Sequence, residues 1–204
     1  MTSVTHTTGA YDLTDLPSIV LGSVKLGLLE AVVVLLFSLA MRALGGLAEM
    51  AVCGLILAAG LAAVSLLPGI WTRARTIEGI AGAAGIGLGA AFVFLLADVA
   101  LLQNIGTYTN RWLEVGRSNW WYHPIWWMVG TFLPWMGGWT LANQTTRRGN
   151  ASPVMAFAMA AVFAIVIGSL AVVVGFPGAQ WHLATYGVAF LPGVALAAAL
   201  SGLG

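Results

Sequence analysis

Long apolar segments alternate with short polar connections along most of the chain. Six segments each hold about twenty mostly apolar residues, at 18–41, 46–67, 79–102, 121–141, 153–174 and 181–201. A helix needs roughly 20 such residues to cross the hydrocarbon core of a bilayer. The pattern therefore predicts an all-α, polytopic integral membrane protein, built as a bundle of about six transmembrane helices with short loops.

The connections between these segments are short, and several contain glycine or proline. Gly45-Gly46, Pro68-Gly69 and Pro177-Gly178 mark three of them, whereas the longest, 103–120, is polar and aromatic. No stretch is long enough to form a soluble domain. We expect a polar N-terminal tail over residues 1–17 and a single transmembrane bundle over residues 18–204.

Two charged residues, Lys25 and Glu30, interrupt the first segment and leave its bounds open. The helix could start near 18, or near 26 with a shift toward Leu44 and a turn at Gly45-Gly46. The later start allows five spans and one interfacial segment. Residues 1–16 contain no Lys or Arg, which a signal peptide would need, so the first helix is expected to remain as a membrane anchor.

The composition supports membrane insertion and indicates no catalytic chemistry. The chain is 60% hydrophobic and 7% charged, against roughly 25% charged residues in soluble domains. Cys53 is the only cysteine, so internal disulfides and multi-thiolate metal sites are excluded within one chain. The sequence has no phosphate-binding loop, no zinc-protease motif, no hydrolase nucleophile motif and no basic patch for nucleic acid.

Arginines divide almost evenly between the two faces of the membrane. With six spans, four arginines lie on the side of both termini, namely Arg73, Arg75, Arg147 and Arg148. The other three, Arg42, Arg111 and Arg117, lie on the opposite side. Basic residues are more frequent in cytoplasmic loops. The small excess favours cytoplasmic termini, and we expect the membrane to be a bacterial inner membrane.

Small residues recur at helical spacing in two segments. One stripe consists of Ala156, Ala160, Ala164 and Gly168, and the other of Gly82, Gly85 and Gly89. Such stripes let helix backbones approach closely, because small side chains leave room between them. In lipid no hydrophobic effect drives helices together, so dispersion at these close contacts holds them instead. They favour packing inside the bundle, with packing of the 153–174 segment against a partner subunit as the alternative.

Tryptophan is concentrated around the start of the fourth segment, where seven of the nine tryptophans lie between Trp112 and Trp139. Tryptophan accumulates where hydrocarbon meets water, and a simple interfacial belt would end after about one turn. Trp121, Trp135 and Trp139 instead follow one side of the helix into its far half. This pattern indicates a face that contacts lipid, a partner helix or a flat cofactor.

Three ionisable residues are expected at membrane depth, namely Lys25, Glu30 and Asp98. A charge in the hydrocarbon costs at least roughly 2.5 kcal/mol, so such residues face water or an interior partner. Together they could line a path for protons, ions or a small solute. The alternatives are that Lys25 reaches the surface, that Glu30 is protonated or paired, and that Asp98 forms an interhelical hydrogen bond.

Two histidines, His123 and His182, each open a helix on the same face of the membrane, followed one turn later by Trp127 and Tyr186. Two histidines at equal depth could ligate a haem, a chlorin pigment or a metal, or donate hydrogen bonds to a quinone. The simpler interpretation is interfacial histidine without a ligand. No clustered metal-ligand set supports a metal site.

These patterns favour a non-catalytic subunit of a larger, energy-transducing membrane complex, photosynthetic or respiratory. Its aromatic helix would pack against partner subunits or their cofactors, and the expected surroundings are the lipid bilayer and other membrane subunits. One alternative is a transporter of protons, ions or small solutes that uses Glu30, Asp98 and Lys25. Another is a haem- or quinone-binding redox subunit that uses His123 and His182.

Overall fold

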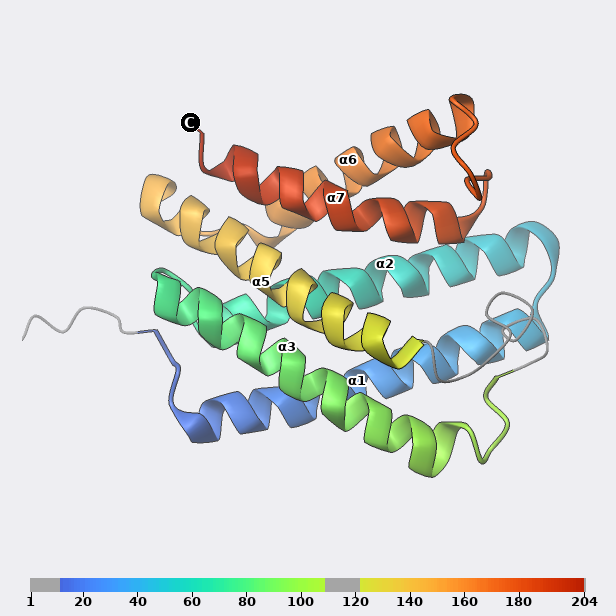
Figure 1. Cartoon of the computed structure of the whole chain (residues 1–204), viewed down its shortest axis with the longest axis horizontal. Coiled ribbons are helices and arrows are strands. Elements are labelled where there is room, and N and C mark those ends of the chain that lie inside the picture. Colours follow the sequence, from blue (N-terminus) through green and yellow to red (C-terminus); the bar gives the residue numbers. More distant parts are fainter. Residues whose placement is uncertain (1–11, 109–121, 204) are drawn as a thin grey trace, which may run out of the picture.

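Six long helices run side by side in the computed structural model, which describes residues 12–108 and 122–203 (Figure 1). They are α1 (Leu16–Ala43), α2 (Gly46–Trp71), α3 (Ile77–Ala97), α5 (Tyr122–Arg148), α6 (Pro153–Val173) and α7 (Leu183–Ser201), and a π-helical turn, η1 (Asp98–Leu102), extends α3. Successive helices run in opposite directions, so the start of α1 and the end of α7 lie at the same end of the bundle. The predicted all-α bundle is confirmed.

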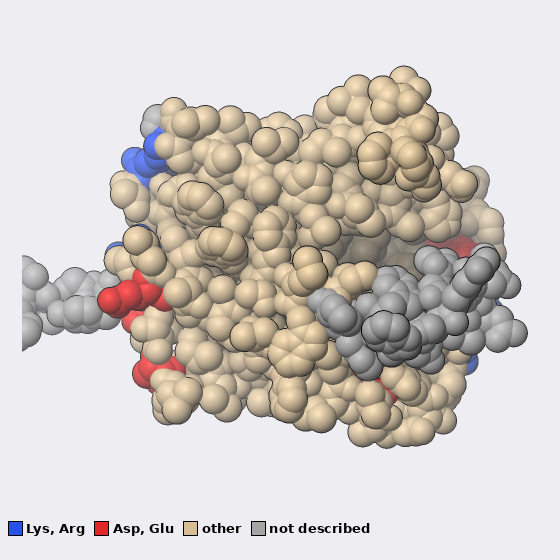
Figure 2. Space-filling view, in the orientation of Figure 1, with Lys and Arg blue, Asp and Glu red and all other residues tan. Residues whose placement is uncertain are grey.

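The surface of the bundle is that of an integral membrane protein. Five helices, α1, α2, α3 with η1, α6 and α7, are long and apolar enough to cross a membrane. The sixth, α5, is less apolar and runs beside them between the same two ends. On the face drawn in Figure 2, charged side chains lie toward the two ends of the molecule, with an uncharged belt between them.

The first helix starts early because its N-terminus is capped. Asp15 adopts extended backbone geometry, and its Oδ2 accepts a hydrogen bond from the amide of Ser18 at 3.2 Å. Pro17 supplies the fixed φ that suits a first helical turn. The hydrogen bonds from Ser18 lower the pKa of the Asp15 carboxyl, since they stabilise its charged form. Thus α1 begins at Leu16 rather than near 26.

The second helix continues through Pro68-Gly69 instead of ending there, and stops at Trp71. It closes with two nested hydrogen bonds, from the Arg73 amide to the Ile70 carbonyl at 3.1 Å and from the Ala74 amide to the Gly69 carbonyl at 2.9 Å. This Schellman arrangement requires a left-handed residue, and Arg73 takes it with φ +52°. Glycine usually occupies that place, because a side chain there costs about 1–2 kcal/mol.

The aromatic helix α5 lies against α2, α3, α6 and α7. It reaches α2 and α3 through glycine, where the backbones touch. A Cβ atom added to Gly69 on α2 would lie 2.8 Å from the Cα of Gly138 on α5, and one added to Gly137 would overlap the carbonyl oxygen of Ser65. On α3, a Cβ at Gly87 would overlap the carbonyl oxygen of Gly130. The position of α5 therefore depends on residues that have no side chain.

The two small-residue stripes of the sequence face helices of the same chain. The α6 stripe is buried, and at its centre the carbonyl oxygen of Ala160 would lie 2.8 Å from a Cβ placed on Gly193 of α7. At its end, a Cβ on Gly168 would lie 2.8 Å from Cδ1 of Tyr186. The α3 stripe faces α1, where a Cβ on Gly89 would overlap the Ser23 hydroxyl.

Replacing Gly137 with alanine tests the backbone contact of α5. The added methyl group would overlap the Ser65 carbonyl, so Gly137→Ala is expected to lower the free energy of unfolding by about 1–3 kcal/mol. Unfolding in detergent, followed by circular dichroism, measures the difference. The matched control is Gly54→Ala on α2, whose Cβ would meet only Cδ2 of Leu183 at 3.5 Å. Equal losses in the two variants would contradict the backbone contact.

Candidate functional site

The most unusual polar group inside the bundle is the carboxyl of Glu30. This residue is the fifteenth of the 28 residues of α1, which places it roughly 20 Å from either end of the helix. It is 3% exposed, and neither carboxylate oxygen has a hydrogen-bond partner among the described residues. Buried polar groups in native proteins are nearly always bonded to protein or ordered water.

The side of α1 that carries Glu30 faces the groove between α2 and α3. Gly27, one turn earlier, packs against α3, where its Cβ would lie 2.6 Å from the Ala90 carbonyl oxygen. Val33, on the other flank, lies over Gly60 of α2, where a Cβ added to that glycine would be 3.0 Å from Cγ1 of Val33. Leu26 clusters with Ile86 and Ala90. These neighbours are apolar and offer no group that would stabilise a carboxylate.

The second buried acid, Asp98, has the opposite environment. It opens the π-helical turn η1 and is fully buried. Its carboxylate accepts hydrogen bonds from Nε2 of Gln103, at 2.7 Å, and from the hydroxyl of Tyr108. Single π-turns occur frequently at functional sites. Here the turn aims a carboxylate inward and provides it with donors from the connection that follows.

Further polar contacts join the end of α1 to this region. Ser38 donates to the carbonyl of Thr107, and the Arg42 guanidinium donates to the carbonyls of Gly106 and Thr107. We call the set the Asp98 cluster, comprising Ser38, Arg42, Asp98, Gln103, Thr107 and Tyr108. Ser38 lies eight residues after Glu30, or about 12 Å along α1. One end of the α1–α3 interface is therefore polar, and Glu30 lies deeper in it.

Of the three residues predicted to line a transport path, the structure brings two to one interface. Glu30 and Asp98 lie on α1 and η1, which contact each other. Lys25 is exposed, about 140° around α1 from Glu30. Sequence reasoning missed the partners in the Asp98 cluster, because Gln103 and Tyr108 reach Asp98 only through the π-turn.

The pairing of His123 with His182 stays a prediction, because only His182 has a described side chain. His182 is exposed and caps α7, its Nδ1 accepting a hydrogen bond from the Ala184 amide at 3.3 Å. Tyr186 is half-buried against α6, with its hydroxyl 3.5 Å from Oγ of Ser169. The side chain of His123 lies outside the described part of the chain. Within that part, no group of three His, Cys, Asp or Glu residues could hold a metal ion.

The aromatic helix has two kinds of face. Trp126 packs against the buried ring of Phe94, with the ring centroids 4.4 Å apart and the planes tilted by 41°. Met128, Trp135 and Trp139 point outward and are 71%, 47% and 40% exposed. Trp127 is also exposed, beside Phe92. Trp121 lies outside the described residues. The outward residues form a continuous face, since they recur at intervals of seven and four.

The two buried acids should respond oppositely to apolar substitution. Glu30→Met removes an unpaired carboxyl and is expected to raise the free energy of unfolding by about 1–3 kcal/mol, whereas Asp98→Leu strands two donors and should lower it by a similar amount. Unfolding in detergent gives both values. A loss of stability in Glu30→Met would reveal a bonding partner, such as ordered water, and contradict the unpaired state.

Comparisons with protein-family models, with curated proteins and with solved structures found no match. The geometry by itself shows a polytopic helical membrane protein with one unpaired acid in its interior, one hydrogen-bonded acid near an end, and an outward aromatic face.

Proposed function

We propose that the protein moves protons across the membrane, alone or together with a small solute, and that Glu30 is the group that carries the proton. The observation behind this proposal is a carboxyl at the middle of the bundle whose two oxygens have no partner among the described residues. Intramembrane acids are costly, rare and concentrated in ion and proton pathways. A purely structural acid would have gained a donor, as Asp98 has.

The Asp98 cluster is the polar approach to Glu30 in this proposal. Its carboxylate, hydroxyl and amide groups lie at the end of the interface that α1 shares with α3 and η1. Chains of such groups, bridged by water, pass protons between one another. Lys25 has no part in the path, because it is exposed on another side of α1.

Flux in reconstituted vesicles tests the role of Glu30. Vesicles loaded with a pH-sensitive dye and energised by a potassium gradient should acidify when they contain the wild-type protein. Glu30→Gln keeps the shape of the side chain but cannot release a proton, so we expect the flux to fall at least about tenfold. Lys25→Gln is the matched control, since it removes an exposed charge from the same helix and should retain the flux.

A proton flux in Glu30→Gln equal to that of the wild type would exclude Glu30 from the mechanism. Asp98→Asn adds a second readout, because it alters the polar approach without touching Glu30. We expect the proton flux of Asp98→Asn to be slower than that of the wild type, and the flux of Lys25→Gln to equal it.

A second candidate function follows from the outward aromatic face of α5. A subunit of a larger complex, photosynthetic or respiratory, would bury Met128, Trp135 and Trp139 against a partner helix or a haem, quinone or pigment that the partner carries. Aromatic residues and methionine are enriched in the centres of protein interfaces. The observation that favours this function is the exposure of these side chains from Met128 to Trp139, which continues well past the first turn of α5 where an interfacial belt would end.

Mild extraction from the native membrane tests this second function. A complex subunit should migrate with companion proteins, and the double variant Trp135→Ala and Trp139→Ala should release them while the chain stays folded. Met155→Ala on α6 provides the control, because Met155 is 52% exposed but belongs to a different helix from the aromatic face. Migration of the wild-type chain without companions or an absorbing cofactor would exclude the subunit role.

A further inference from the structure

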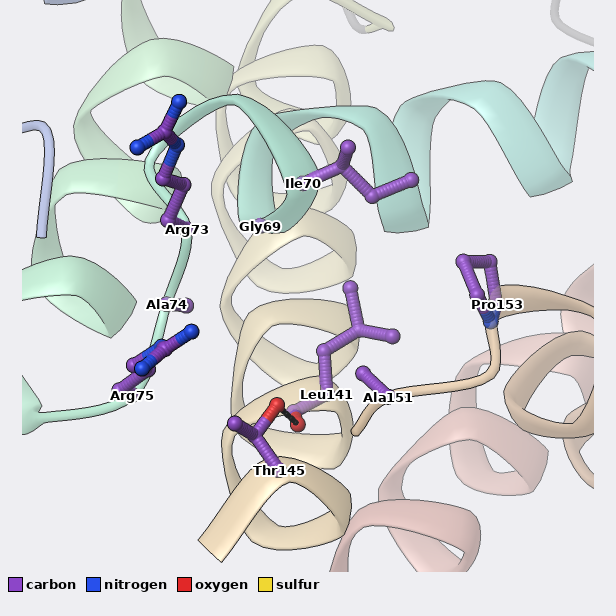
Figure 3. A pocket seen from close by; sticks show the side chains of 9 residues that line it. All are labelled: Gly69, Ile70, Arg73, Ala74, Arg75, Leu141, Thr145, Ala151 and Pro153. Atoms are coloured by element: carbon purple, nitrogen blue, oxygen red, sulfur yellow. Dashed lines mark hydrogen bonds between the residues drawn. The ribbon is translucent and has the colours of Figure 1, made fainter. Parts of the chain in front are cut away.

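A small cavity opens at the end of the bundle where α1 begins and α7 ends. Its volume is about 220 Å³, and it lies between the α2–α3 turn, α5 and the start of α6 (Figure 3). Sites for drug-sized molecules are larger, at roughly 300–1,000 Å³. The size therefore suits one small chemical group rather than a whole solute.

The lining of this cavity is basic at the rim and apolar inside. Figure 3 shows Arg73 and Arg75 on the α2–α3 turn at one side, and Leu141, Thr145 and Pro153 at the other. The Arg75 side chain points toward them, whereas the Arg73 side chain extends past the end of α2. The hydroxyl of Thr145 donates to the Leu141 carbonyl at 2.9 Å. A cationic rim over an apolar floor, at the level where a helix bundle leaves the hydrocarbon, is complementary to an anionic group attached to an apolar body.

Two acids at this end of the molecule cap helices, and a third, Glu78, is exposed in the first turn of α3. Asp12 accepts hydrogen bonds from the amides of Arg75, Thr76 and Gly79, between 3.0 and 3.1 Å, and so caps the start of α3. Asp15 caps α1. Among the described residues, no carboxylate lies within ion-pairing distance of the Arg73 or Arg75 guanidinium. The two guanidinium groups therefore have no ion-pair partner among the described residues, although the Asp12 carboxylate lies on the Arg75 amide.

The backbone of Arg73 supplies an independent observation. Arg73 occupies the left-handed position of the α2 C-terminal cap, with φ +52°, where glycine would be free of strain. Residues held in strained backbone conformations are concentrated at binding and catalytic sites. Arg73 is among the residues that line the cavity, and a glycine at this position would supply no cation there.

We propose that this cavity binds the phosphate group of an anionic phospholipid. Guanidinium groups match phosphate oxygens with paired hydrogen bonds, and the apolar floor of Leu141 and Pro153 accommodates the carbon atoms next to the phosphate. A free phosphate ion shares the same chemistry but would gain nothing from the floor. The site is separate from Glu30 and does not depend on the transport proposal.

Native mass spectrometry of the whole chain in mild detergent tests the site, with phosphatidylglycerol as the probe and phosphatidylcholine as its zwitterionic counterpart. We expect the wild-type chain to bind phosphatidylglycerol at least about tenfold more tightly than phosphatidylcholine. The double variant Arg73→Gly and Arg75→Gln should lose this preference. Arg148→Gln is the control, because Arg148 is exposed at the same end of α5 but does not line the cavity.

Thermal unfolding of the same proteins distinguishes the two sources of phosphate. Arg73→Gly relieves the strained cap, so the double variant should unfold at the same or a higher temperature in the absence of lipid, and its loss of binding cannot then be attributed to misfolding. Stabilisation of the wild type by phosphatidylglycerol but not by sodium phosphate supports the lipid, whereas equal stabilisation by both contradicts it. A preference for phosphatidylglycerol that survives in the double variant overturns the site.

Discussion

Close contact between backbones holds this bundle together. Helices in a bilayer gain little from leaving lipid, so their association depends on fit and on hydrogen bonds. At Gly87 and Gly130, and again at Gly69 and Gly138, α5 approaches α3 and α2 so closely that a methyl group has no room. These contacts give the least apolar helix its place among the others. Polar side chains of α5 bond within the chain; for example, Oε1 of Gln144 accepts a hydrogen bond from the Ser152 amide at 2.8 Å.

The same tight packing separates the two buried acids. Where α1 and α3 lie flat against each other, no polar atom reaches the Glu30 carboxyl, and it stays without a partner among the described residues. Where α3 gives way to the π-turn, the regular helical pairing is interrupted, and side chains from the following connection reach Asp98. Uniform helices leave an acid isolated, whereas an irregular turn supplies it with donors. This contrast is the physical basis for assigning the two residues different roles.

Most of the fold could be predicted from the sequence, because the lengths of the apolar segments and the glycine and proline residues between them determine the helices. The depth of Glu30 also followed from its distance to the segment ends. The Asp98 cluster could not be predicted, since it needs a π-turn that has no simple residue signature. The strained cap at Arg73 was hidden because arginine stands where glycine is usual, and Pro68-Gly69 resembled a connection although α2 continues through it.

The parallel pairing of α1 with α3 has a consequence for how the chain is inserted into the membrane. Ser23 of α1 bonds to the Ile86 carbonyl of α3, 63 residues later in the chain. At about 5–20 residues per second, translation takes several seconds to cover that distance. During this interval α1 must reside in the membrane with Glu30 uncovered, and only its long apolar surface offsets the cost of that acid. The acid that the finished bundle leaves without a hydrogen-bond partner among the described residues is therefore one that its own biogenesis exposes early.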